Sequence, residues 1–380
     1  MSFTINFILT WFATFFIGLI LTPLVRLLAF KIGAVDTPNE RRINKTVMPS
    51  AGGLAIFSAF TISTLLILPN IIQVPNYLSY VVPIVVGGLV IVITGLIDDI
   101  KEIRPWQKSI GILIASLVIY IFSDIHFDTF SIPGILQTVY LDWWLSAPLT
   151  IIWIFSLTNA VNLIDGLDGL ASGVSVISLS TIGIVGYFFL PAQSVFIPIT
   201  IFTMVAAILG FFPYNFHPAK IYLGDTGALL LGFMIAVLSL QGLKNATFVA
   251  VLTPMFVLGV PITDTLFAII RRKLNNQPMS SPDRSHLHHR LLSLGFSQRS
   301  AVLTIYCISI VFSFIALLMS YASRTALIFL VLATFLGVEI FVELVGVLGE
   351  HTPMLKLLNA IGDRERRLRL LKKNKDEEDD

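Results

Sequence analysis

Eleven apolar runs, each near or above the length that crosses a lipid bilayer, constrain this chain more than any other feature. A helix needs about 20 mainly apolar residues to cross about 30 Å of hydrocarbon. Only 13% of the 380 residues are charged, against about 25% in a typical soluble domain, which excludes a disordered protein, a coiled coil and an ordinary soluble enzyme. We therefore predict an all-α, polytopic membrane protein with about 11 transmembrane helices. The runs cover residues 4–28, 51–69, 81–97, 109–123, 147–161, 173–190, 194–212, 227–243, 247–270, 301–320 and 325–348.

The basic residues predict the orientation of these helices, because Lys and Arg gather in cytoplasmic loops. With the N-terminus outside, all of the 25 Lys and Arg residues except Lys244 and Arg324 fall in cytoplasmic segments. We therefore expect the N-terminus outside and the C-terminus in the cytoplasm. Residues 1–350 are expected to form one integral membrane domain, followed by a basic and then acidic cytoplasmic tail over 351–380. The loops that face the cytoplasm and carry the candidate site are 30–50, 98–108, 162–172, 213–226 and 271–300.

Five aspartates lie at the predicted cytoplasmic ends of the apolar runs. Converging carboxylates repel one another unless a cation lies among them, and Mg²⁺ is a hard cation that prefers oxygen ligands. The alternative is that each aspartate caps a helix or stays solvated at the membrane interface. We favour a metal site because all five fall on one side of the membrane. They are Asp98, Asp99, Asp165, Asp168 and Asp225.

The spacing of these acids predicts part of their geometry. Asp165 and Asp168 are three residues apart, so a helical turn would place both on one face, with Asn162 beside them. The glycines that flank Asp225 favour a tight turn at a helix start, where free N–H groups suit an anion.

A histidine-rich stretch lies in the last long cytoplasmic loop. His286, His288 and His289 could supply three nitrogens to zinc, but the flanking Arg284 and Arg290 would repel a cation. A basic loop that binds a diphosphate fits better, and an ordinary surface loop is the remaining alternative. We expect structural roles for His126, His217 and His351. The single cysteine, Cys307, is expected to be a buried apolar side chain.

The residues alone predict a membrane-embedded, metal-dependent phosphotransferase. A secondary transporter is the main alternative from another class, but it predicts acids in the middle of spans and repeated halves, which the sequence lacks. An intramembrane aspartyl protease is suggested by Leu223-Gly224-Asp225, but Tyr222 stands where that motif needs a glycine.

The combination of these motifs resembles the polyprenyl-phosphate N-acetylhexosamine-1-phosphate transferases, of the glycosyltransferase family 4 type. The resemblance runs from Asp36-Thr-Pro-Asn and Met48-Pro-Ser-Ala-Gly-Gly to the His-Leu-His-His loop. It includes the Asp98-Asp99 pair and the run Asn-Ala-Val-Asn-Leu-Ile-Asp-Gly-Leu-Asp-Gly from Asn159. Members of this family move a sugar 1-phosphate from a uridine diphosphate sugar to a membrane polyprenyl phosphate and release UMP.

The resemblance also implies roles for single residues. Asp225 is implied as the Mg²⁺ ligand, with Asn162 at the metal or diphosphate, and Mn²⁺ as a substitute metal. Asp98 and Asp99 are implied at the acceptor phosphate, with three options open: Asp98 as a base, orientation without a base, and a covalent aspartyl intermediate. Asp165 and Asp168 are implied as further catalytic acids. The substrate-binding residues implied are Lys45, Lys108, Asn159, Asn162, Asn215, Tyr222, His286, His288, His289 and Arg290.

Within the family, the His-Leu-His-His-Arg-Leu-Leu loop resembles the branch that uses UDP-N-acetylglucosamine. The branch that transfers phospho-N-acetylmuramoyl-pentapeptide in peptidoglycan synthesis is the alternative. The resemblance implies undecaprenyl phosphate as the acceptor, and a bacterial plasma membrane with the active site facing the cytoplasm. It also implies that the reaction is the first step in the synthesis of a cell-envelope glycopolymer, and we predict wall teichoic acid as that polymer. It implies no nucleic acid partner and leaves a homodimer open.

Overall fold

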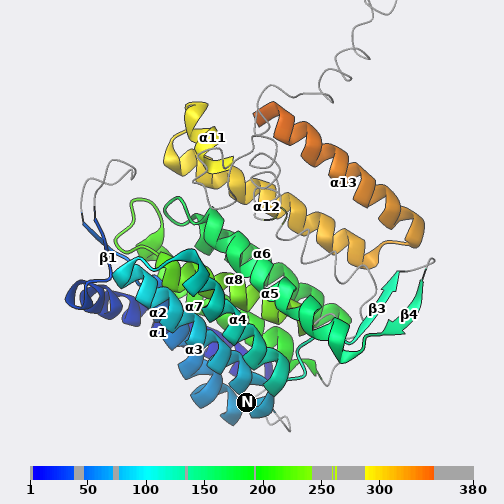
Figure 1. The fold of residues 1–380 in the computed structure, drawn as a ribbon, viewed down its shortest axis with the longest axis horizontal. Coiled ribbons are helices and arrows are strands. Elements are labelled where there is room, and N and C mark those ends of the chain that lie inside the picture. The colour runs from blue at the N-terminus through cyan, green and yellow to red at the C-terminus, as the bar shows by residue number, and fades with distance from the viewer. Residues whose placement is uncertain are drawn as a thin grey trace, which may run out of the picture.

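The computed structural model describes residues 3–37, 47–71, 77–132, 136–191, 194–241, 259, 262 and 287–345. These residues form a bundle of long helices with two small two-stranded sheets (Figure 1). The first helices are α1 (Phe3–Ile32), α2 (Gly52–Ile62) with its continuation η1 (Ser63–Ile67) and η2 (Leu68–Asn70), α3 (Tyr77–Lys101), α4 (Pro105–Phe122) and α5 (Trp143–Ile164). The later ones are α6 (Leu170–Phe189), α7 (Phe196–Asn215), α8 (Gly224–Gln241), α11 (Leu287–Ser293), α12 (Gln298–Tyr321) and α13 (Arg324–Val345).

The predicted membrane spans correspond closely to these helices. Every predicted run has a matching helix except 247–270, which lies outside the described residues apart from 259 and 262. Within the described residues, eight helices are long and apolar enough to cross a membrane. Two shorter apolar helices, 224–240 and 325–340, correspond to α8 and α13. The protein is therefore polytopic, while the count of 11 spans and their orientation stay predictions.

Two small sheets depart from the all-α prediction. Strands β1 (Val35–Asp36) and β2 (Met48–Pro49) pair antiparallel, as do β3 (Thr129–Ile132) and β4 (Leu136–Tyr140). The β3–β4 hairpin falls in the segment between α4 and α5, where β-branched and aromatic residues favour extended backbone. The two sheets lie at opposite ends of the bundle (Figure 1).

Helix α8 lies at the centre of the bundle and packs against α2, α3, α5 and α6. Its side chains from Ala228 to Leu240 are almost completely buried. The reason is in its sequence, since LGDTGALLLGFMIAVLSLQ is apolar on every side after its first turn, and such a helix is stable only when surrounded.

Small residues let neighbouring helices approach the first turn of α8. A Cβ added to Gly95 of α3 would lie 2.5 Å from the Cα atom of Thr226, and one added to Gly53 of α2 would lie 2.3 Å from the backbone nitrogen of Gly227. Glycine at such points allows backbones to pack directly on each other. The N-terminus of α8 is therefore held against the C-terminal part of α3, which carries Asp98 and Asp99.

The outer helices carry large apolar side chains on their exposed faces, as contact with lipid tails requires. Leu27 of α1, Phe314 of α12 and Phe335 of α13 are each more than 60% exposed. Cys307 is also exposed on α12, so the expectation that it is buried was wrong. Among the described elements, its helix packs mainly against α6, and this contact does not bury Cys307.

Candidate active site

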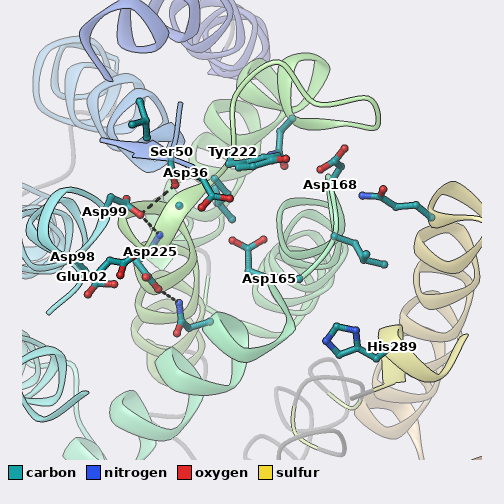
Figure 2. A pocket seen from close by; sticks show the side chains of 18 residues that line it. Asp36, Ser50, Asp98, Asp99, Glu102, Asp165, Asp168, Tyr222, Asp225 and His289 are labelled. Atoms are coloured by element: carbon teal, nitrogen blue, oxygen red, sulfur yellow. Dashed lines mark hydrogen bonds between the residues drawn. The ribbon is translucent and has the colours of Figure 1, made fainter. Parts of the chain in front are cut away.

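A cavity of about 410 Å³ lies where α3, α5 and α7 end and α8 and α12 begin (Figure 2). Each of the five loops that the sequence predicted to carry the candidate site contributes residues to it. Seven of its lining side chains are carboxylic acids, namely Asp36, Asp98, Asp99, Glu102, Asp165, Asp168 and Asp225. The other lining residues are Val35, Ser50, Asn162, Gly166, Leu167, Asn215, Tyr222, Leu223, Gly224, His289 and Gln298.

Lys108 joins two of these acids. Its ammonium nitrogen lies 2.5 Å from Oδ2 of Asp98 and 3.0 Å from Oδ2 of Asp225. Asn162 donates from Nδ2 to the other oxygen of Asp225 at 2.5 Å. The backbone N–H of Ile103 donates to Oδ1 of Asp98 at 2.8 Å. One network of charge-assisted hydrogen bonds therefore connects ends of α3, α4, α5 and α8 that are far apart in sequence.

Asp99 has different partners from its neighbour Asp98. Its Oδ1 accepts the backbone N–H of Asp225 at 2.9 Å and its Oδ2 accepts that of Thr226 at 3.0 Å. The hydroxyls of Thr226 and Ser50 also donate to this carboxylate. Because the first N–H groups of a helix have no partner within it, Asp99 acts as an N-cap for α8 from a distant part of the chain.

The tight turn predicted before Asp225 is confirmed. Gly224 has a φ of +71°, a conformation that favours glycine, and a Cβ there would lie 2.5 Å from Oδ2 of Asp99. The turn thus lets the carboxylate of Asp99 reach the start of α8. The anion that accepts from the free N–H groups at this helix start is the carboxylate of Asp99.

Asp165 lies beyond the last residue of α5 and points into the middle of the cavity, with Asp98, Asp99 and Asp225 to one side and His289 across from it (Figure 2). Within the described part of the chain its carboxylate has no hydrogen-bond or ion-pair partner. Burial, followed by the negative charge of Asp225, raises the pKa of the Asp165 carboxyl well above its ordinary value. A buried acid without a counter-charge in a cavity is a candidate functional group.

The predicted substrate-binding residues of α5, α7 and the connection from α7 to α8 divide into lining and internal groups. Tyr222 lines the cavity. Asn215 also lines it but is only 3% exposed, and its amide already accepts from Ser172 at 2.7 Å and donates to the backbone oxygen of Ile221 at 3.2 Å. Asn159 donates to the backbone of its own helix and is absent from the described lining. Nucleotide contact by these residues stays a prediction.

The residues of the histidine loop occupy different positions. His289 lines the cavity, whereas His288 is buried and packs so close to Gly166 that a methyl group there would overlap its ring. The Nε atom of Arg290 is buried with no hydrogen-bond partner in the described residues. His286 and Lys45, predicted to bind substrate, lie outside the described residues.

Sequence reasoning missed four polar side chains of the lining. Asp36 and Ser50 belong to segments that carried the family resemblance, and the β1–β2 pairing brings both beside Tyr222, whose backbone bonds to Pro49 at 2.8 Å. Glu102 follows the aspartate pair and adopts a φ of 49°, which aims it back toward the cavity. No sequence signal marked Gln298, which the packing of α12 brings to the rim.

The cavity suits a hard divalent cation by its donor set. Seven carboxylic acids line the cavity. One of them, Asp165, has no hydrogen-bond or ion-pair partner among the described residues, and it lies near Asp225 and Asn162. In the described residues, no three His, Cys, Asp or Glu side chains are already arranged around one metal position. Mg²⁺ commonly takes one or two carboxylates and completes its shell with water and substrate phosphates, so this donor set fits it.

Comparison with known proteins gives a consistent assignment. A family model described as Glycosyl transferase family 4 matches residues 81–243, which hold most of the cavity. A Bacillus subtilis (strain 168) protein named "Probable undecaprenyl-phosphate N-acetylglucosaminyl 1-phosphate transferase" is 40% identical over 333 residues, or 87% of this chain and 90% of that protein. A decaprenyl-phosphate N-acetylglucosaminephosphotransferase of Mycolicibacterium smegmatis is 35% identical, covering 79% of this chain and 76% of its own.

A more distant relative agrees with these two. It is an undecaprenyl-phosphate alpha-N-acetylglucosaminyl 1-phosphate transferase of Salmonella typhi, 27% identical over 74% of this chain and 75% of its own length. Since similarity of this extent covers most of each protein, and the cavity holds the acids expected from the motifs, this chain belongs to glycosyl transferase family 4 and is an enzyme.

Proposed function

We propose that this protein transfers N-acetylglucosamine 1-phosphate from UDP-N-acetylglucosamine to undecaprenyl phosphate, forming undecaprenyl-diphospho-N-acetylglucosamine and UMP. The names of the three relatives support the sugar and the polyprenyl phosphate class of acceptor. The observation that carries the proposal is the Asp98–Lys108–Asp225–Asn162 network beside an acid-lined cavity at the end of a membrane bundle.

In the proposed reaction, a phosphate oxygen of the lipid acceptor attacks the phosphorus that carries the sugar. The bond between that phosphorus and the oxygen of the uridine-bearing phosphate breaks, and UMP leaves with the electron pair. A phosphate monoester is already largely ionised at neutral pH, since its second pKa is about 6. The acceptor therefore needs orientation and relief of charge repulsion more than it needs a base.

The hydrogen bonds of the aspartates support direct transfer over a covalent aspartyl intermediate. Both oxygens of Asp98, Asp99 and Asp225 already have partners. Asp165 has no hydrogen-bond partner among the described residues, but burial raises its pKa, and a protonated carboxyl is a poor nucleophile. We propose that Lys108 holds Asp98 and Asp225 in place while substrate phosphates approach, because its charge offsets part of their repulsion.

A divalent cation, Mg²⁺ first and Mn²⁺ as a substitute, would be held by Asp225 and the amide oxygen of Asn162, with Asp165 close by. When bound it would supply positive charge to the diphosphate and the developing charge on UMP. His289, across the cavity from Asp165 in Figure 2, is placed to contact the diphosphate from the other side.

The orientation and pathway extend this proposal. The cavity lies at the end of the bundle where α3 ends and α4 begins, with Lys101, Arg104 and Lys108, and this favours a cytoplasmic active site in a bacterial plasma membrane. The product is a lipid-linked sugar, so the enzyme that consumes it must extend a glycan. We propose the first step of a cell-envelope glycopolymer, with wall teichoic acid as the polymer.

The decisive experiment is UMP release by the purified protein given undecaprenyl phosphate and UDP-N-acetylglucosamine, with Mg²⁺ or with EDTA. We expect UMP only when lipid, sugar nucleotide and Mg²⁺ are all present. Release with UDP-N-acetylmuramoyl-pentapeptide alone would reassign the protein to the other branch of the family. Full activity in EDTA would refute the metal, and no release with either donor from folded protein would refute the proposed reaction.

A further inference from the structure

His217 bonds to a carboxylate of the cavity without lining the cavity itself. Its ring nitrogen Nδ1 lies 2.8 Å from Oδ2 of Asp168. The backbone N–H of Ala219 donates to the same oxygen at 3.1 Å. Because a carboxylate only accepts hydrogen bonds when ionised, the ring nitrogen is the donor in this contact. Asp168 lines the cavity, and His217 does not belong to its described lining.

This contact joins two segments that carry candidate site residues. Asp168 lies in the turn between α5 and α6, and His217 lies in the connection from α7 to α8, which also holds Tyr222. A second bond between the same segments runs from the Ser172 hydroxyl to Oδ1 of Asn215 at 2.7 Å. The connection is also fixed internally, since the backbone N–H of Lys220 donates to the oxygen of Tyr214 at 2.7 Å.

The two donors leave the carboxylate of Asp168 with one available oxygen. Both bonds go to Oδ2, and in the described part of the chain Oδ1 accepts no hydrogen bond. Two donors on one oxygen fix the rotation of the carboxylate plane, so the position of Oδ1 is determined by the protein before a ligand arrives. The Asp168 side chain is only 14% exposed, which makes this orientation costly to lose.

We propose that His217 is a positioning residue for the sugar-nucleotide donor, acting through Asp168. A carboxylate oxygen repels phosphate, so Oδ1 of Asp168 accepts from an uncharged part of the donor, an N–H or O–H of its base or a sugar. This inference rests on the proposed function and assigns a role to a histidine that the sequence indicated as structural. It predicts that loss of His217 weakens donor binding and leaves the phosphoryl transfer step largely intact.

Three substitutions separate positioning from simple packing. His217→Asn keeps a donor group near the position of Nδ1, whereas His217→Gln preserves more of the ring volume but carries its amide near the position of Nε2. His217→Ala removes both the donor group and the ring volume. A matched control is His126→Ala, which deletes another His–Asp contact, 2.7 Å to Asp128, in the segment between α4 and β3.

The experiment measures kcat and KM for UDP-N-acetylglucosamine and for undecaprenyl phosphate with each variant. We expect His217→Ala and His217→Gln to raise the donor KM about tenfold, the loss typical of one hydrogen bond to a charged group. Their kcat and lipid KM should change less than about twofold, as should every constant of His217→Asn and His126→Ala. In an Asp168→Ala background, His217→Ala should not weaken the calorimetric affinity for UDP-N-acetylglucosamine further.

Several results would overturn the inference. A wild-type donor KM in His217→Ala and His217→Gln would remove the role of the histidine, and so would additive losses in the Asp168→Ala background. Equal losses in Asn, Gln and Ala variants, with a lower Tm, would show a packing role only. If the wild-type protein fails to turn over UDP-N-acetylglucosamine, the proposed function fails and this inference falls with it.

Discussion

At the scale of single residues, two adjacent aspartates have separate tasks. Asp98 bonds to Lys108 and faces the polar network, whereas Asp99 accepts backbone N–H groups at the start of α8. Neighbouring residues of a helix point about 100° apart, so the pair could not share one ligand position. The family resemblance implies the acceptor phosphate for both aspartates, because a sequence does not show which partners each side chain has.

The division predicts different effects of substituting the two aspartates. Asp99→Ala should lower the free energy of unfolding by about 1–3 kcal/mol, since the first N–H groups of α8 lose their acceptor. Asp98→Ala should abolish UMP release with a smaller change in Tm, because Lys108 keeps its bond to Asp225. Thermal unfolding in detergent and UMP release measure the two effects. Equal loss of Tm in both variants would contradict the division.

The pH dependence of stability should report on Asp165. Its pKa in the folded protein is raised, so folding favours its protonated form. The stability contributed by this proton is fully present below the ordinary carboxyl range and is lost as the pH rises through the raised value. We therefore expect the Tm of wild type in EDTA to fall as the pH increases, and Asp165→Asn to fall less.

Asp165→Asn should also be inactive, because an amide cannot take up the negative charge that a divalent cation attracts. Added Mg²⁺ should raise the wild-type Tm more at alkaline than at acidic pH, since the cation binds the ionised cavity. The Tm of both proteins is measured across the same pH series by differential scanning fluorimetry. Parallel pH curves for the two proteins in EDTA would contradict the assignment to Asp165.

At the scale of helices, the site depends on how closely α3 approaches α8. Gly95 lies one turn before Asp98 and packs on the backbone of Thr226. Because the carboxylate of Asp99 must reach N–H groups of α8, a shift of about 1 Å would break its hydrogen bonds. The absence of a side chain at one position of α3 therefore decides the geometry of the acid cluster.

This dependence predicts opposite effects of two Gly→Ala changes. Gly95→Ala should destabilise the protein by about 1–3 kcal/mol through overpacking and lower its activity strongly. Gly186→Ala in α6 should leave activity unchanged and stabilise by up to about 1 kcal/mol, because its new Cβ meets only Leu190 at 3.5 Å and Pro198 at 3.9 Å. Unfolding and UMP assays on both variants provide the comparison. Wild-type activity in Gly95→Ala would refute the requirement for close approach.

At the scale of the whole molecule, strand β1 and the β3–β4 hairpin lie at opposite ends of the bundle (Figure 1). The polar cavity lies at the β1 end, since Val35 and Asp36 line it. Helices α4 and α5 run between these ends, with exposed Arg104 before α4 and exposed Asp142 before α5. The distribution of Lys and Arg predicts that the end with Arg104 faces the cytoplasm.

Cysteine labelling in intact cells tests this orientation. With Cys307→Ser removing the single native cysteine, Asp142→Cys should react with a membrane-impermeant maleimide and Arg104→Cys should react only after the cells are opened. Both single-cysteine proteins should keep UMP release, which confirms that they are folded. The reverse labelling pattern would show that the topology is inverted relative to this prediction.

The sequence alone determined the class of protein, the position of nearly every long helix and five of the seven acids of the cavity, because membrane solubility and charge repulsion act on residue type and spacing. It also indicated the start of α8, since glycines next to an acid favour a turn there. Tertiary structure alone decided which partner each polar group has: Asp99 with α8, Lys108 between Asp98 and Asp225, and His217 with Asp168. These choices depend on close contact between helices distant in sequence, and periodicity carries no information about such contacts.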